Sequence, residues 1–276
     1  MFQYDFMQHA FIAGTFVAVM CGAFGVFVMA RGLSFISHTF SHIGFSGASF
    51  AVFMGWDPLT GLLLFTTVSG LAVGQMGVKI FRRDAAVSVI LSLFLGLGIL
   101  FLFLSNKQTN FATTILFGSV VGISRQNVIE IVIISLILLI VLILSYRVLK
   151  FDSFDPAGAH AAGLPVRFIS IGFLFVLSIL VAEAVQIVGA LLVFALLTVP
   201  ASAARHLTHS VFGMILLSSL FSLIGVWAGL SLSYITNVPV SFYITIIEAI
   251  FYFLALIWQT VRLRWTKERT YRAKNI

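Results

Sequence analysis

Charged side chains are scarce in this sequence, and their scarcity sets its broad class. Asp, Glu, Lys and Arg make up 9% of the 276 residues, whereas apolar residues make up 61%. Windows of roughly 20 uncharged residues recur along the whole length, each long enough to cross the ~30 Å hydrocarbon core of a bilayer. Because every polar stretch is short, a hidden soluble domain is excluded. The sequence predicts an all-α polytopic membrane protein, expected to be one transmembrane domain over residues 1–276.

Other absences exclude further classes. The one cysteine, Cys21, excludes an internal disulfide framework. The start of the chain, Met1 to His9, lacks the basic region of a cleaved signal peptide. There is no G-x-x-x-x-G-K-[ST] phosphate loop, so the chain is not expected to bind ATP in that way. Basic residues lie in turns between apolar runs, which makes membrane lipid the expected contact and nucleic acid an unexpected partner.

The apolar runs predict about nine transmembrane helices, with eight to ten possible. The candidate spans are 10–30, 33–55, 58–78, 85–104, 128–146, 168–183, 184–203, 211–234 and 241–259. As one helix, the run 168–203 would measure about 54 Å, so two short spans joined by a turn near 183–189 are expected. The stretch 110–124 is too short to cross and too apolar for a free loop, which predicts a re-entrant or interfacial helix.

The basic residues predict the orientation. With an odd number of spans, 14 of the 16 Lys and Arg residues fall on one side of the membrane, and Lys107 and Arg125 fall on the other. The positive-inside rule then places the N-terminus outside and the C-terminus, with its basic tail 262–276, in the cytoplasm.

A short cytoplasmic segment, 151–166, carries helix start and stop signals. Asp155 followed by Pro156 is an N-cap with proline at the first helical position. Gly163 and Pro165 end the element after one or two turns. The alanine-rich helix between them offers a smooth surface that another protein can contact, although the local pattern also fits an ordinary connecting loop.

Two histidines, His38 and His42, interrupt the second apolar run. Their spacing places both imidazoles on one face of a helix, where they can share one transition-metal ion. Alternatively, they hydrogen-bond to carbonyls or to Ser37 and Ser41 and hold helices together. The stretch has the spacing of H-E-x-x-H, but Thr39 stands where a metalloprotease needs its Glu, so hydrolysis is not expected.

Glu183 and Glu248 are the other ionisable groups expected inside the membrane. Glu183 is expected near the outer turn of the short pair of spans, with partial solvation as the simpler interpretation. Glu248 lies inside the last span, where a carboxylate needs a partner or a proton. Either one is a weaker candidate for a further metal ligand.

Three segments resemble the membrane permeases of bacterial ABC importers for zinc and manganese. They are "ARGLSFISHTFSHIGFSGASFA" (30–51), "FDPAGAHAAGLPV" (154–166) and "VQIVGALLVFALLTVPASAARHL" (185–207). The first segment usually reads R-G-x-S-x-x-x-D-x-x-S-H in that family, and its Asp and His line the metal route. Here His38 stands at the Asp position, and the other positions match: Arg31, Gly32, Ser34, Ser41 and His42. In the third segment Gly189, Pro200 and Ala201 keep the family pattern.

The resemblance implies the core of a type II importer in the bacterial cytoplasmic membrane. The implied partners are a second copy of the chain, two cytoplasmic ATP-binding subunits and an extracytoplasmic metal-binding protein. The permease would hydrolyse nothing itself. The segment 151–166 would couple it to the ATPase, with Asp155, Ala157, Ala161 and Gly163 at the contact. Imidazole in place of carboxylate at position 38 favours zinc over manganese.

Three other interpretations stay open: a manganese permease of the same family, a metal carrier that is not driven by ATP, and a permease of this architecture for a siderophore or vitamin.

Overall fold

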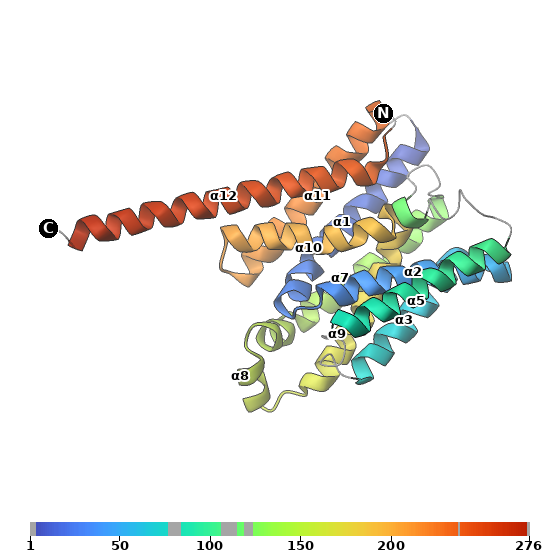
Figure 1. Ribbon diagram of the computed structural model, residues 1–276, viewed down its shortest axis with the longest axis horizontal. Coiled ribbons are helices and arrows are strands. Elements are labelled where there is room, and N and C mark those ends of the chain that lie inside the picture. The colour runs from blue at the N-terminus through green and yellow to red at the C-terminus, as the bar shows by residue number, and fades with distance from the viewer. Residues whose placement is uncertain (1–3, 77–83, 106–114, 119–123, 237, 275–276) are drawn as a thin grey trace.

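The computed structural model describes residues 4–76, 84–105, 115–118, 124–236 and 238–274. Within these ranges the named elements are all α-helices, and no strand occurs. They are arranged as a bundle of long helices with one short helix, α8, at its edge (Figure 1). Their bounds are α1 (Asp5–Ala30), α2 (Ser34–Met54), α3 (Pro58–Met76), α5 (Asp84–Leu104), α7 (Arg125–Phe154), α8 (Pro156–Ala161), α9 (Val166–Val188), α10 (Ala190–Leu207), α11 (Val211–Thr236) and α12 (Val240–Lys274).

Every predicted span overlaps a long helix, which confirms the all-helical membrane class, although the span predicted at 184–203 begins in the last residues of α9 and continues into α10. In the described residues, 8 helices are long and apolar enough to cross a bilayer. They are α1, α3, α5, α7, α9, α10, α11 and α12. Helix α2 has the required length of 21 residues, but its serines and histidines make it more polar than the other long helices. It nevertheless lies among its neighbours and packs against α3, α5, α9 and α10.

The bundle has inner and outer helices. Of the 18 most apolar consecutive residues of α1, 78% are buried inside the bundle. In α5 and α12 the corresponding share is 17%. The largest buried side chains include Phe24, Phe27, Phe40 and Phe45 from α1 and α2, which belong to the same hydrophobic cluster as leucines of α9. The outer helices expose leucine, isoleucine and phenylalanine side chains, as expected for surfaces that face lipid tails.

Small residues allow some helix backbones to touch. A Cβ atom on Gly47 of α2 would lie 2.3 Å from the Gly61 carbonyl oxygen of α3, and a Cβ atom on Gly61 would lie 2.1 Å from the Gly47 carbonyl oxygen. Neither position has room for a side chain. Close approach at small residues is a common way for membrane helices to associate, because lipid provides no hydrophobic force between them.

The long apolar run 168–203 is divided at one residue. Gly189 has φ of 87° and ψ of 153°, which ends α9 and begins α10. This conformation strains residues with a Cβ atom. The predicted turn near 183–189 is therefore present, at the end of the predicted range.

The predicted re-entrant helix 110–124 lies largely outside the described residues. Its described residues are 115–118 and Ser124, and the backbone at Gly118 lies close to the α9–α10 break. A Cβ atom on Gly189 would lie 2.3 Å from the backbone nitrogen of Gly118.

The segment 151–166 differs from the sequence prediction in one respect. Helix α7 continues to Phe154, so the first four residues of the segment form the last turn of a long helix. The short helix α8 then begins as predicted, with Pro156 at its start and the Asp155 carboxylate accepting a hydrogen bond from the Gly158 backbone N–H at 2.9 Å. Gly163, with φ of 76°, ends it.

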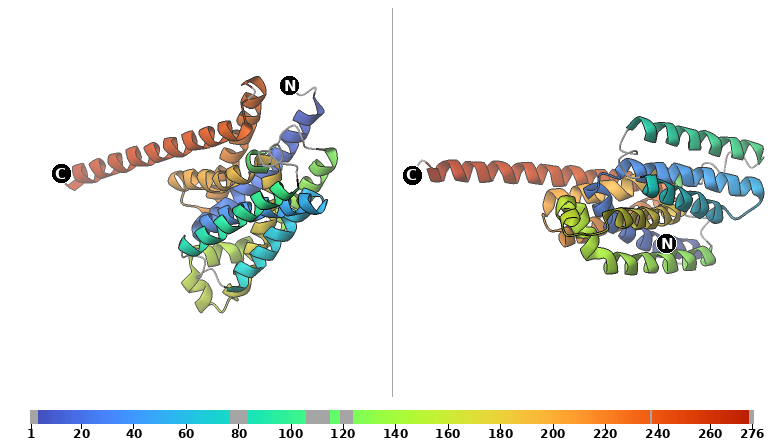
Figure 2. Two further views of the ribbon diagram at one scale, coloured as in Figure 1. Left: turned by 45° about the vertical axis from the view of Figure 1, so that its right-hand side comes forward. Right: turned by 90° about the horizontal axis from the view of Figure 1, so that it is seen from below.

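The two ends of the bundle carry different segments. Helix α8 lies at the end opposite the N-terminus, and the C-terminal part of α12 extends beyond the other helices in all the views (Figures 1 and 2). The α8 end and the C-terminus lie toward the same side.

Candidate functional site

His38 and His42 lie side by side on α2. Their rings are nearly perpendicular, with centroids 4.7 Å apart, as the spacing of four residues predicts. The Nδ1 atoms of both rings are buried, and neither has a hydrogen-bond partner in the described part of the chain. Buried imidazole nitrogens ordinarily have a partner, so this pair has unused binding capacity.

The neighbouring serines do not hold the histidines. The Ser37 hydroxyl donates to the Ser34 carbonyl at 2.7 Å, and the Ser41 hydroxyl donates to the His38 carbonyl at 2.7 Å. Both bonds stay within α2. The alternative in which Ser37 and Ser41 bond to the imidazoles is therefore wrong for this structure.

The pair faces the inside of the bundle. His42 is 5% exposed, and the His38 ring lies 5.0 Å from the ring of Phe194 on α10. Helices α9 and α10 both pack against α2. The site is thus two adjacent imidazoles between inner helices, with an aromatic ring on one side.

Glu183 is buried, which corrects the expectation of partial solvation. It is 1% exposed, because α9 continues past it to Val188 and the break comes later, at Gly189. One carboxyl oxygen, Oε1, accepts a hydrogen bond from the Ser135 hydroxyl of α7 at 2.8 Å. The other oxygen, Oε2, is buried without a partner among the described residues.

Glu248 lies inside α12 and is also 1% exposed. It packs against Gly225 of α11, where a Cβ atom would lie 3.2 Å from the Glu248 Cγ. Neither of its carboxyl oxygens has a hydrogen-bond partner within the described ranges.

The glutamates do not join the histidines in one cluster. No group of three or more His, Cys, Asp or Glu side chains suited to one metal ion occurs in the residues that the structure describes. The two imidazoles are therefore the candidate ligand pair. Glu183 and Glu248 are separate buried carboxyl groups.

Helix α8 presents small residues outward. Ala159 is fully buried and anchors the helix, while Ala157, Ala161 and Gly163 are exposed, as is the capping residue Asp155. The helix packs against α7 and α9. The side chains of Ala157 and Ala161 end at Cβ and Gly163 has none, whereas Asp155 and His160 add two polar side chains to the exposed surface.

A bundle with 8 helices long and apolar enough to cross a bilayer, among the described residues, defines a multi-pass membrane protein. The chain belongs to the ABC 3 transport family, whose model matches residues 3–259. It is a membrane subunit of an ABC transport system and not an enzyme, as the sequence predicted.

Two relatives and one solved structure show what the chain is similar to. It is 31% identical to the manganese transport system membrane protein MntC of Listeria monocytogenes, over 93% of this chain and 91% of that protein. It is 27% identical to a Haemophilus influenzae protein that is named "Probable iron transport system membrane protein", over 95% of this chain and 97% of that protein. The structure of PsaBC from Streptococcus pneumoniae in complex with Fab matches with a TM-score of 0.82 and 26% identity, over 91% of both chains.

Proposed function

We propose that this chain is the permease of an ATP-driven importer for a divalent transition-metal ion. The observation that carries the proposal is the neighbouring pair His38 and His42, whose ring centroids lie 4.7 Å apart and whose buried Nδ1 atoms lack hydrogen-bond partners in the described residues. Two imidazoles suit a transported ion, because a fuller set of ligands would bind it too tightly for release. Glu183 and Glu248 remain weaker candidates, as charges that attract the cation elsewhere along its route.

Two observations favour different ions. Imidazole nitrogen at position 38 favours zinc, since manganese prefers carboxylate oxygen. In contrast, the Listeria monocytogenes relative is named for manganese transport. Zinc and manganese are therefore the two candidates, and flux measurements with both ions separate them.

The proposed assembly is a type II importer in the bacterial cytoplasmic membrane. It contains two copies of the chain, two cytoplasmic ATP-binding subunits and an extracytoplasmic metal-binding protein. Residues 1–276 form one transmembrane domain in which α2 is a ninth span. Family membership and the absence of a phosphate loop support ATP hydrolysis on a separate chain. The exposed small residues of α8 support a docking site for the ATP-binding subunit.

The proposal is tested by metal uptake in cells that lack the native permease. His38→Ala and His42→Ala are each expected to lower flux of the transported ion by at least about tenfold, as loss of metal-site groups commonly does. His209→Ala is the control, because His209 is exposed in the turn between α10 and α11. Wild-type flux in both alanine variants would show that the histidines have no role in transport.

The same assay separates the other interpretations. Uptake that persists when the ATP-binding partner is inactivated would identify a carrier that is not driven by ATP. Uptake of a siderophore or vitamin that does not need either histidine would identify a permease for a larger substrate.

A further inference from the structure

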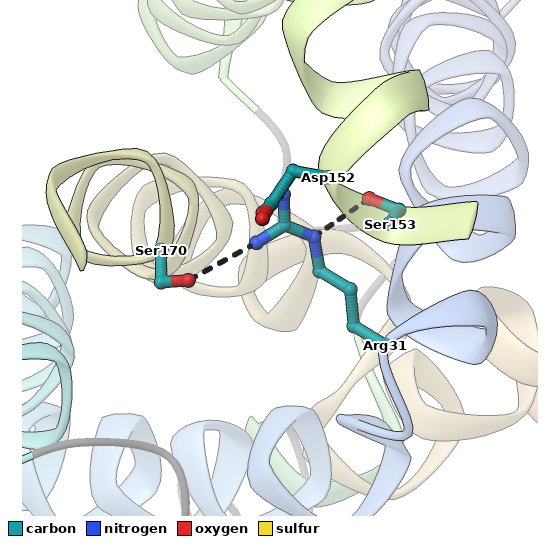
Figure 3. A network of polar contacts seen from close by, with 4 residues as sticks. All are labelled: Arg31, Asp152, Ser153 and Ser170. Carbon is teal, nitrogen blue, oxygen red and sulfur yellow. Dashed lines mark hydrogen bonds and ion pairs between the residues drawn. The ribbon is translucent and has the colours of Figure 1, made fainter. Parts of the chain in front are cut away.

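The guanidinium of Arg31 joins three helices at the α8 end of the bundle (Figure 3). Arg31 is the residue that caps α1. Its Nη2 atom lies 2.7 Å from a carboxylate oxygen of Asp152, and its Nε atom donates to the Ser153 hydroxyl at 2.8 Å. Both of these residues belong to the last turn of α7. From α9, the Ser170 hydroxyl lies 3.5 Å from Nη1, and the guanidinium carbon lies 4.7 Å from the centre of the Phe173 ring.

The ion pair is buried. The side chains are 8% and 3% exposed. Burial lowers the pKa of the Arg31 guanidinium, and the Asp152 carboxylate offsets part of that effect. Arginine stays protonated in proteins under such conditions, so the pair is ionic. A planar guanidinium with several directed contacts transmits displacement better than a lysine ammonium, which has no fixed contact geometry.

The helix termini explain why a cation is needed here. The C-terminal ends of α1 and α7 both carry partial negative charge, which favours a cation nearby. Asp152 adds a full negative charge to the end of α7, where an anion is unfavourable without a partner. The turn after Arg31 is also fixed, because Gly32, with φ of 67°, and Leu33 donate to the Met29 and Val28 carbonyls at 3.2 and 2.9 Å.

The pair lies between the two parts of the proposed machinery. Asp152 and Ser153 lie three and two residues before Asp155, the residue that caps α8. Arg31 precedes α2, and His38 lies in the second turn of that helix. A cavity at this point is lined by Arg31, Leu33, Asp152, Pro156 and Ser170, so the end of α1, the end of α7, the start of α8 and α9 share its wall.

We propose that the Arg31–Asp152 ion pair transmits movement of α8 to the α1–α2 turn and from there to His38 and His42. Arg31 and Asp152 are positioning residues, since neither contacts the ion. This inference rests on the proposed function, because it assumes that α8 docks on an ATP-binding subunit. It assigns a role to Asp152, which lies in the segment 151–166 but before the residues 154–166 that carry the resemblance, and which was not among the predicted contact residues.

The experiment measures metal transport and ATP hydrolysis in the same proteoliposomes, with the complete importer. Arg31→Gln and Asp152→Asn are each expected to raise the ATP hydrolysed per ion by at least about fivefold, the lower end of ordinary coupling between sites. Arg31→Lys keeps the charge but loses the guanidinium fork, so an intermediate ratio is expected. Arg167→Gln is the matched control, since Arg167 is an exposed arginine at the start of α9.

A charge exchange keeps the test decisive if a single variant does not assemble. The double variant Arg31→Asp with Asp152→Arg is expected to restore assembly and to recover part of the coupling. An unchanged ratio in assembled Arg31→Gln and Asp152→Asn complexes would overturn the inference. Recovered assembly without recovered coupling in the double variant would also overturn it, because the pair would then be structural. Failure of the wild-type importer to move any metal would instead count against the proposed function.

Discussion

His38 is the residue at which this sequence departs from the pattern that it resembles, and the departure changes the ligand chemistry. We expect His38→Asp to retain more transport than His38→Ala, because a carboxylate still binds a divalent ion. We also expect it to raise manganese flux relative to zinc flux, since oxygen ligands suit manganese better. Competition uptake with both ions measures the ratio. An unchanged ratio would mean that position 38 does not select the ion.

Glu248 differs from Glu183 in having no hydrogen-bond partner in the described residues for either oxygen. A buried polar group left unpaired costs about 1–3 kcal/mol, so Glu248→Met is expected to raise the thermal unfolding midpoint of the purified permease. Glu183→Met is the matched comparison. It removes the acceptor of the Ser135 hydroxyl and is expected to give no such gain. A lower midpoint for Glu248→Met would show that the carboxyl group has a stabilising partner.

At the scale of elements, α8 combines one buried anchor, Ala159, with exposed small residues at positions 157, 161 and 163. We expect Ala157→Trp, Ala161→Trp and Gly163→Asp to uncouple ATP hydrolysis from transport while the permease stays folded, because a close contact surface has no room for them. Ala157→Ser is the conservative control. Assembled complexes are assayed for both activities, and normal transport in all three variants would show that α8 is not the docking site.

The ends of the helices were largely predictable, because local signals fix them. Asp155 with Pro156 starts α8, Gly163 ends it, and Gly189 divides a run that is too long for one span. Contacts between distant segments were not predictable. The Arg31–Asp152 pair joins residues 121 positions apart (152 minus 31), and no periodicity in either segment marks it. The burial of Glu183 was missed for a related reason, since it depends on where α9 ends and on Ser135 of α7.

The position of the candidate metal pair was predicted from the sequence, but its surroundings were not. Spacing placed His38 and His42 on one face, and the resemblance gave the pair a context. The unpaired Nδ1 atoms and the neighbouring Phe194 ring depend on how α2 meets α10, which the sequence does not encode locally.

At the scale of the whole molecule, the charge distribution predicts one orientation. Helix α8 and the C-terminus lie toward one side, and the N-terminus lies at the opposite end (Figure 1). We therefore expect a tag after residue 276 to be inaccessible in intact cells, and a tag near Asp5 to be accessible from outside. Permeabilised cells provide the control. Exposure of the C-terminal tag in intact cells would reverse the orientation.

The polarity of α2 has a consequence for how the protein enters the membrane. This helix contains the histidine pair and several serines, and it is too polar to count among the 8 clearly apolar spans. Membrane insertion of a segment depends on its summed hydrophobicity, so α2 alone is expected to insert poorly. Helix α3 meets it at Gly47 and Gly61 and can enter with it as a hairpin. In a glycosylation-reporter assay, α2 followed by α3 should insert more completely than α2 alone. Gly61→Leu should remove this increase in the inserted fraction. The residues proposed to bind the cargo would then make biogenesis depend on a neighbouring helix.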